Sequence, residues 1–122
     1  MEHKQQPLVL VVEDEPFVRM VATEGLEDAG FEVIEAASAD DALRILSSRD
    51  DVGVLFTDIN MPGSCDGVEL ARLVHERWPA LRIVITSGKE HLRASEIPDE
   101  GRFVPKPYWP GQIADVIEEM IG

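Results

Sequence analysis

The stretch Leu8-Val-Leu-Val-Val-Glu-Asp-Glu-Pro16 (LVLVVEDEP) decides the fold. Its apolar residues form a continuous run rather than an alternating one, which is typical of a strand that is buried on both faces of a sheet. Pro16 indicates the start of a helix, because a proline at the first helical position loses no hydrogen bond. The stretch therefore predicts a strand, an acidic loop and a helix, in that order.

The same order of strand and helix repeats along the chain. Gly30 is suited to end the helix that starts at Pro16, and Ser38 and Asp66 are suited to cap two further helices. Pro110 indicates the start of a last helix. The other apolar runs predict strands over residues 31–36, 52–57, 81–86 and 103–104. Strands that alternate with helices predict an α/β fold with a parallel sheet covered on both faces.

Composition limits what kind of protein this is. A chain of 122 residues with 44% hydrophobic and 29% charged residues is typical of one globular domain, and we expect a polar tail over residues 1–7 and the domain over 8–122. The net charge of −13 disfavours binding to nucleic acid and to anionic membranes. The single cysteine excludes an internal disulfide. Because no apolar run approaches the ~20 residues of a membrane span, we expect a cytoplasmic location.

Polar side chains stand where the predicted strands end. Glu13 and Asp14 follow the first strand, Asp58 the third, Thr86 ends the fourth and Lys106 follows the fifth. Parallel strands place these ends at one edge of the sheet, where ligands bind. Three carboxylates at one place repel each other unless a cation joins them, and Mg²⁺ is the cation that prefers such oxygen ligands. The three carboxylates, one Mg²⁺ and Lys106 sum to zero charge.

This set of residues fits phosphoryl transfer. Asp58 is the candidate nucleophile, and Thr86 offers a hydroxyl to the oxygens of the transferred group. Acidic residues at strand ends are also ordinary loop residues in an acidic protein, and for any single one that interpretation is favoured. The full set, distributed over separate strand ends with a lysine after the last, favours a functional site.

Four short motifs resemble those of a known family. They are VVEDE at 11–15, DINMPG at 58–63, ITSG at 85–88 and KPY at 106–108. Together they resemble the receiver domain of response regulators in two-component signalling, over Leu8 to Ile121. The resemblance implies a flavodoxin-like, doubly wound, five-stranded parallel sheet of order 2-1-3-4-5 with five helices. It also implies a sensor histidine kinase or histidine phosphotransfer protein as partner, an output protein, and a regulatory domain rather than an enzyme.

The resemblance also assigns roles to seven residues. They are Asp58 as phosphoacceptor and metal ligand, Asp14 as a direct Mg²⁺ ligand, Glu13 as a ligand through water, Asn60 as a ligand through its backbone carbonyl, Lys106 as the phosphate-binding lysine, and Thr86 and Phe103 as switch residues. Glu13 and Phe103 depart from the family pattern, in which aspartate and tyrosine are more common. The resemblance further implies a cis peptide bond between Lys106 and Pro107.

The segment 89–102, where the family has its fourth helix, is mostly polar. Its few apolar residues offer little surface to bury, and helices shorter than ~12 to 15 residues need packing to persist. We therefore expect a short or irregular fourth helix there.

Other interpretations of the site are weaker but concrete. Residues 58–69 partly fit a calcium-binding loop, yet Pro62 offers no side-chain ligand at one required position. A haloacid-type phosphatase needs a second aspartate where Asn60 stands. A receiver-like interaction domain that never accepts phosphate is the stronger alternative. Because the chain ends at Gly122, directly after the last predicted helix, we expect a stand-alone receiver, with a fragment of a hybrid histidine kinase as the alternative.

Overall fold

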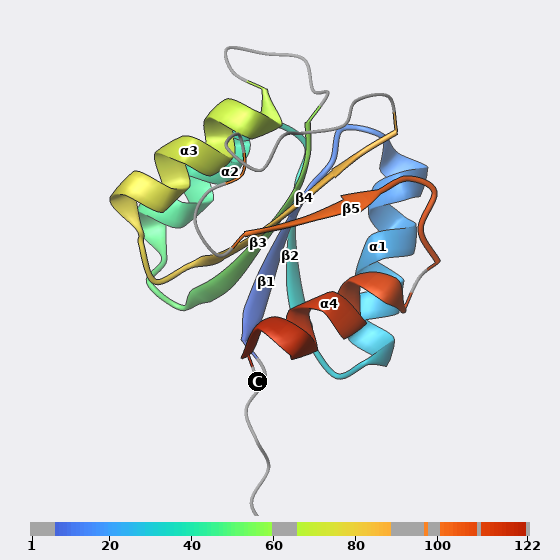
Figure 1. Cartoon of the computed structure of the whole chain (residues 1–122). Coiled ribbons are helices and arrows are strands. Elements are labelled where there is room, and N and C mark those ends of the chain that lie inside the picture. The colour runs from blue at the N-terminus through green and yellow to red at the C-terminus, as the bar shows by residue number, and fades with distance from the viewer. Residues whose placement is uncertain (1–6, 60–65, 89–96, 98–100, 110, 122) are drawn as a thin grey trace, which may run out of the picture.

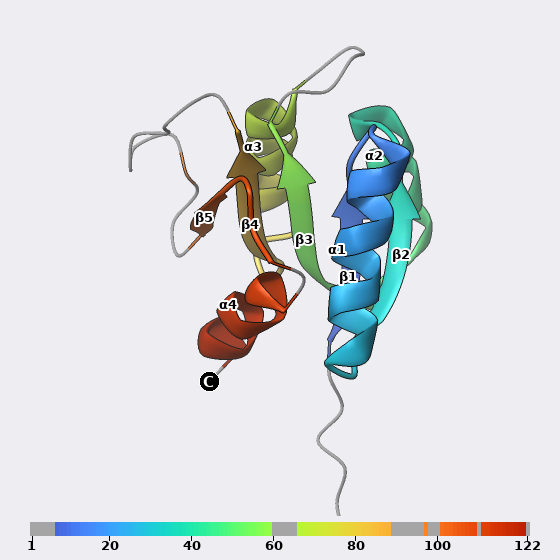
Figure 2. The same ribbon diagram turned by 90° about the vertical axis from the view of Figure 1, so that its right-hand side faces the viewer.

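The computed structural model describes residues 7–59, 66–88, 97, 101–109 and 111–121. These residues form a sheet of five parallel strands in the order β2-β1-β3-β4-β5, as the resemblance implied. Figure 2 shows the strands side by side in this order. The elements, in chain order, are β1 (Leu8–Val12), α1 (Pro16–Asp28), β2 (Glu32–Ala36), α2 (Ala39–Ser48), β3 (Val52–Asp58), α3 (Gly67–Arg77), β4 (Arg82–Ser87), β5 (Arg102–Pro105) and α4 (Gln112–Ile121).

Helices cover both faces of the sheet (Figure 1). α2 and α3 pack on one face, and α1 and α4 pack on the other. Every residue of β1 is buried, and the side chains of residues 9–12 alternate between the two apolar clusters that the helices form with the sheet. The continuous apolar run at the start of the sequence is therefore explained by burial on both faces, and the predicted α/β fold is confirmed.

The predicted helix ends are confirmed at three places. The Ser38 side chain accepts a hydrogen bond from the Asp41 N–H at 3.1 Å, and the Asp66 side chain accepts one from the Glu69 N–H at 3.0 Å. Gly30, just after α1, has φ of 95°, a backbone conformation that glycine adopts at little cost. These local patterns succeeded because a cap depends only on residues a few positions apart.

The strand ends agree with the predicted ranges to within one residue, β5 being longer by one residue at each end. The described part of α4 begins at Gln112, and Pro110 lies outside the described residues. Four helices lie in the described ranges, and the segment that we expected to hold a short fourth helix falls almost entirely outside them. No helix in those ranges has the length and apolar character that crossing a membrane requires.

Candidate functional site

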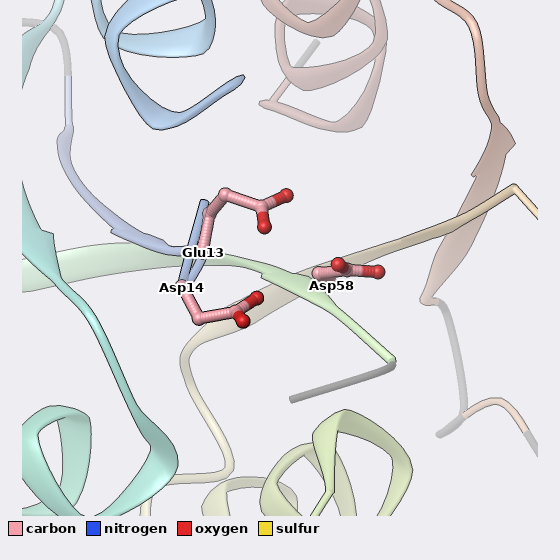
Figure 3. A group of neighbouring side chains, drawn as sticks. All are labelled: Glu13, Asp14 and Asp58. Carbon is pink, nitrogen blue, oxygen red and sulfur yellow. The ribbon is translucent and has the colours of Figure 1, made fainter. Parts of the chain in front are cut away.

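Three carboxylates meet at the carboxyl edge of the sheet. Asp58 is the last residue of β3, and Glu13 and Asp14 directly follow β1, its neighbour in the sheet. One carboxylate oxygen from each residue lies within 4.8 Å of the others. Figure 3 shows the Glu13 and Asp14 side chains leaving consecutive residues and extending toward Asp58. The sheet order therefore brings together residues that are more than 40 positions apart in the sequence.

Lys106 joins two of these carboxylates. Its Nζ lies 3.0 Å from Glu13 Oε1 and 3.1 Å from Asp58 Oδ2. Glu13 and Asp58 are only 4% and 6% exposed, whereas Asp14 is exposed. The peptide bond from Lys106 to Pro107 is cis, as the family resemblance implied. A buried charge is tolerable when it is paired and hydrogen-bonded, and Lys106 provides both for Glu13 and Asp58.

Burial and pairing act against each other on these groups. Burial raises the pKa of Glu13, and the negative charge of Asp58 adds to the rise, while hydrogen bonds from Lys106 and from the Glu15 N–H oppose it. Burial is the largest single influence on the pKa of Lys106 and acts to lower it, but the hydrogen bonds to Glu13 and Asp58 and the negative charges of these groups together raise that pKa. Burial has the larger effect on the pKa of Glu13, whereas pairing with the two carboxylates has the larger total effect on the pKa of Lys106. The lysine therefore stays charged.

The donor set fits a hard divalent cation. Three carboxylates and one ammonium leave a charge of −2 on these four side chains. The donor atoms that converge are all carboxylate oxygens, which Mg²⁺ prefers over nitrogen or sulfur. The set is therefore compatible with Mg²⁺ in both charge and ligand type. The predicted fourth ligand, Asn60, lies outside the described residues.

Thr86 ends up beside Asp58. The two residues are paired across β3 and β4, and Thr86 is 1% exposed. Its Oγ1 is buried and has no hydrogen-bond partner within the described part of the chain. A buried hydroxyl without a partner costs free energy that folding does not recover. A ligand oxygen at this edge of the sheet would satisfy it.

Phe103 lies on β5, paired with Ile85 of β4. Its ring is half-buried and packs against the apolar cluster beneath α2 and α3. The structure thus places Phe103 two strands away from Asp58, with β4 between them, and Val104 rather than Phe103 is in register with Thr86. The role of Thr86 and Phe103 as switch residues stays a prediction.

Two residues that support the site were not predicted from the sequence. Arg19 on α1 donates to the backbone carbonyl oxygen of Glu13 at 2.7 Å. Gly67, the first residue of α3, packs so closely beneath Asp58 that a Cβ there would overlap the Asp58 carbonyl oxygen. The adjacent cap residue Asp66 was an indication for the helix start but not for this close approach.

Comparison with known proteins agrees with this geometry. The sequence profile of the response regulator receiver domain family matches residues 9–118. The sensor kinase CckA of Brucella abortus is 35% identical over 117 residues, which are 93% of this chain but only 12% of CckA. A chemotaxis protein CheY homolog of Campylobacter jejuni is 28% identical over 120 residues, covering 93% of this chain and 92% of that protein. This chain therefore spans about an eighth of the length of CckA but almost the whole length of the CheY homolog.

A solved structure supports the same assignment. The receiver domain of NtrX from Brucella abortus superposes with a TM-score of 0.83 at 31% identity, covering 93% of this chain and 97% of that one. The family profile matches most of the chain. The sheet order and the cluster of carboxylates at the sheet edge agree with that match. This chain belongs to the response regulator receiver domain family and is a receiver domain of two-component signal transduction.

Proposed function

We propose that Asp58 accepts a phosphoryl group from a sensor histidine kinase or a histidine phosphotransfer protein, and that the modification changes a surface that binds an output protein. The observation that carries this proposal is the Lys106 ammonium between the buried Glu13 and Asp58 carboxylates. A half-buried lysine in this place neutralises charge, and its ammonium can donate to a phosphoryl oxygen once Asp58 is modified.

The chemistry of the transfer follows from these residues. An Asp58 carboxylate oxygen attacks phosphorus, the P–N bond to the donor histidine breaks, and the imidazole leaves with the electron pair and takes up a proton from solvent. Lys106 and the Thr86 hydroxyl donate to the phosphoryl oxygens. Asp14 and Asp58, with Glu13 through water and the Asn60 carbonyl as proposed further ligand, would hold Mg²⁺, which would supply positive charge to offset the charge of those oxygens. Burial of Asp58 limits access of water.

A phosphorylation assay tests the proposal. With Mg²⁺ and acetyl phosphate as a small donor, the intact mass is expected to rise by one phosphoryl group. Asp58→Asn is expected to abolish the gain, and Asp115→Asn, the same change at an exposed position on α4, is expected to leave it unchanged. Equal labelling of wild type and Asp58→Asn would refute the assignment. Absence of any labelling of the wild type would favour the alternative of an interaction domain that never accepts phosphate.

A second candidate concerns the direction of signalling. The similarity to CckA, a hybrid histidine kinase with a receiver domain, favours a receiver of that type. In this candidate the phosphoryl group on Asp58 passes on to a phosphotransfer protein. The phosphorylated chain would then lose its group faster to a phosphotransfer protein than to water. Transfer assays against the histidine kinases and phosphotransfer proteins of the host distinguish the two candidates. We further propose that the domain acts in the cytoplasm through protein partners, since its net charge of −13 disfavours nucleic acid and anionic membranes.

A further inference from the structure

Arg19 connects two strand ends next to the carboxylate site. It lies in the first turn of α1, and its side chain is 21% exposed. One guanidinium N–H donates to the Glu13 carbonyl oxygen at 2.7 Å, and Nε donates to Glu35 Oε1 at 2.9 Å. Glu35 is on β2, the neighbour of β1. Arg19 therefore holds the turn after β1 against the end of β2.

The bond to the Glu13 carbonyl completes the fixation of that residue. The Glu13 N–H donates to the Ala36 carbonyl at 3.1 Å, and the carboxylate accepts from the Glu15 N–H at 3.1 Å as well as from Lys106. Arg19 supplies the partner of the remaining polar group, the carbonyl. That carbonyl belongs to the peptide unit that joins Glu13 to Asp14, and a peptide unit is planar. Fixing it fixes the point from which the Asp14 side chain starts.

Simple electrostatics does not explain an arginine at this place. A cation in the first turn of a helix is disfavoured by the helix dipole. A cation bonded to the backbone of the carboxylate site also weakens the attraction of the site for a metal ion. Arg19 is nevertheless half of a paired, hydrogen-bonded arrangement with Glu35 and the Glu13 carbonyl. Geometry, rather than charge, is the benefit that this arrangement offers to the site.

We infer that Arg19 is a positioning residue for the carboxylate site: its two hydrogen bonds preset the backbone of Glu13 and Asp14 before the cation binds. The inference rests on the proposed function, because it concerns the same cation. Residues that orient metal ligands typically contribute about ten-fold or more to metal affinity. Arginine suits this role because its planar fork serves two acceptors at fixed angles, which the single ammonium of lysine does not.

Cation affinity provides a test, because positioning and charge predict opposite changes in affinity when Arg19 is replaced. We would titrate the full chain with Mn²⁺, follow free Mn²⁺ by electron paramagnetic resonance, and add Mg²⁺ as competitor. Arg19→Ala makes the site more negative, so a pure charge effect would tighten binding, whereas the loss of positioning is expected to weaken it by about ten-fold. Arg44→Ala is the matched control, because it removes one positive charge at an exposed position on α2. It is expected to leave the affinity unchanged within about two-fold.

Two further variants separate positioning from loss of structure. Arg19→Lys keeps the positive charge but loses the planar guanidinium group. It is expected not to restore the wild-type affinity for Mn²⁺. Glu35→Gln keeps an acceptor at an exposed position, and it is expected to weaken cation binding less than Arg19→Ala does. In the cation-free protein, hydrogen exchange of the Glu15 N–H, which donates to the Glu13 carboxylate, is expected to accelerate in Arg19→Ala. Exchange of the Asp41 N–H in the α2 cap is expected to stay as in the wild type.

The outcomes that overturn the inference are distinct from those that overturn the proposed function. Equal or tighter Mn²⁺ binding by Arg19→Ala overturns the positioning role alone. Full affinity in Arg19→Lys also overturns it, because charge without the fork would then suffice. A wild-type chain that binds neither Mn²⁺ nor Mg²⁺ overturns the cation-dependent function, and the positioning role with it.

Discussion

The positions of Lys106 and its two carboxylate partners at the ends of predicted strands were enough to predict that these side chains lie together. The sequence predicted that Glu13, Asp14, Asp58 and Lys106 would meet, because parallel strands place their carboxyl ends at one edge. The structure places these side chains together. Their roles as metal ligands, phosphoacceptor and phosphate-binding lysine stay predictions for the assays above. The role of Arg19 was not predicted, because its hydrogen bonds to Glu35 and to the Glu13 carbonyl depend on how α1 is oriented against β2. The spacing of residues along the chain does not indicate that orientation.

Tyr108 gives a prediction about alkaline pH. Burial raises the pKa of its hydroxyl, and the negative charges of Glu13 and Asp58 raise it further. In the unfolded chain this hydroxyl ionises near pH 10. Above that pH the unfolded state loses a proton that the folded state keeps, so the free energy of unfolding falls as pH rises.

Tyr108→Phe removes this contribution and keeps the ring, which meets Phe56 edge-on at a centroid distance of 5.8 Å. Urea unfolding between pH 9 and about pH 11 is expected to show a smaller loss of stability in Tyr108→Phe than in the wild type. The raised pKa of Lys106 also lowers the free energy of unfolding as pH rises, and it does so in both proteins. The difference between the two proteins therefore reports the contribution of the Tyr108 hydroxyl. Parallel pH dependences would contradict the assignment.

The start of α3 is the element whose placement matters most for Asp58. The Gly67 N–H donates to the Ile59 carbonyl at 2.9 Å, and the Ile59 N–H donates to the Thr86 carbonyl at 3.0 Å. A Cβ at position 67 would lie 2.8 Å from the Ile59 Cα and would overlap the Asp58 carbonyl. The first turn of α3 is thus packed directly on the backbone that presents the candidate phosphoacceptor.

Gly67→Ala is therefore expected to destabilise the fold by about 1 to 3 kcal/mol, the usual cost of overpacking, measured by urea unfolding. It is also expected to slow labelling of Asp58 from acetyl phosphate. Gly111→Ala is the matched control, because a Cβ there would meet only Trp109 at an ordinary contact distance of 3.9 Å. Equal stability of the two variants would show that the backbone beneath Asp58 yields easily.

The elements were predicted well where the determinants are local. The caps at Ser38 and Asp66 need only a side chain and an N–H three residues on. Strand ends shifted by one residue because they depend on pairing with a neighbour that lies far away in the sequence. The expected short fourth helix within 89–102 lies almost wholly outside the described residues and stays a prediction.

In the molecule as a whole, modification of Asp58 can act on a partner protein only if it changes the structure of a surface that the partner contacts. Thr86 is paired with Asp58, and β4 and β5 connect it to Phe103. A hydroxyl drawn to the phosphoryl group leaves space that an aromatic ring gains by filling, by up to about 1.5 to 3 kcal/mol for full burial. The modification would shift a balance between two existing states.

Phe103 is therefore expected to become more buried when the phosphoryl mimic beryllofluoride is bound with Mg²⁺, as observed in a crystal structure or by ring chemical shifts. In Thr86→Ala, which retains Asp58, the same addition is expected to leave Phe103 unchanged. Equal burial of the ring with and without the mimic in the wild type would rule out this switch for the protein.

The exposed apolar side chains of α1 give the last prediction. Phe17 and Met20 are 68% and 45% exposed, and residues three apart lie on one face of a helix. α1 begins at the edge of the sheet where β3 ends (Figure 1), and Asp58 is the last residue of β3. A protein that delivers a phosphoryl group to Asp58 is therefore expected to pass close to this face. Large apolar residues that a monomer leaves exposed mark sites of protein contact when they are grouped.

Phe17→Ser is expected to slow phosphotransfer from the host histidine kinase that labels the wild type fastest by about ten-fold, which corresponds to roughly 1.4 kcal/mol of lost contact. Labelling from acetyl phosphate is expected to stay unchanged, because that donor needs no docking surface. Glu27→Ser, at an exposed position near the other end of α1, is the matched control and is expected to affect neither donor. An equal loss with both donors would assign Phe17 to the support of the site, and an unchanged rate with the kinase would place docking on another face.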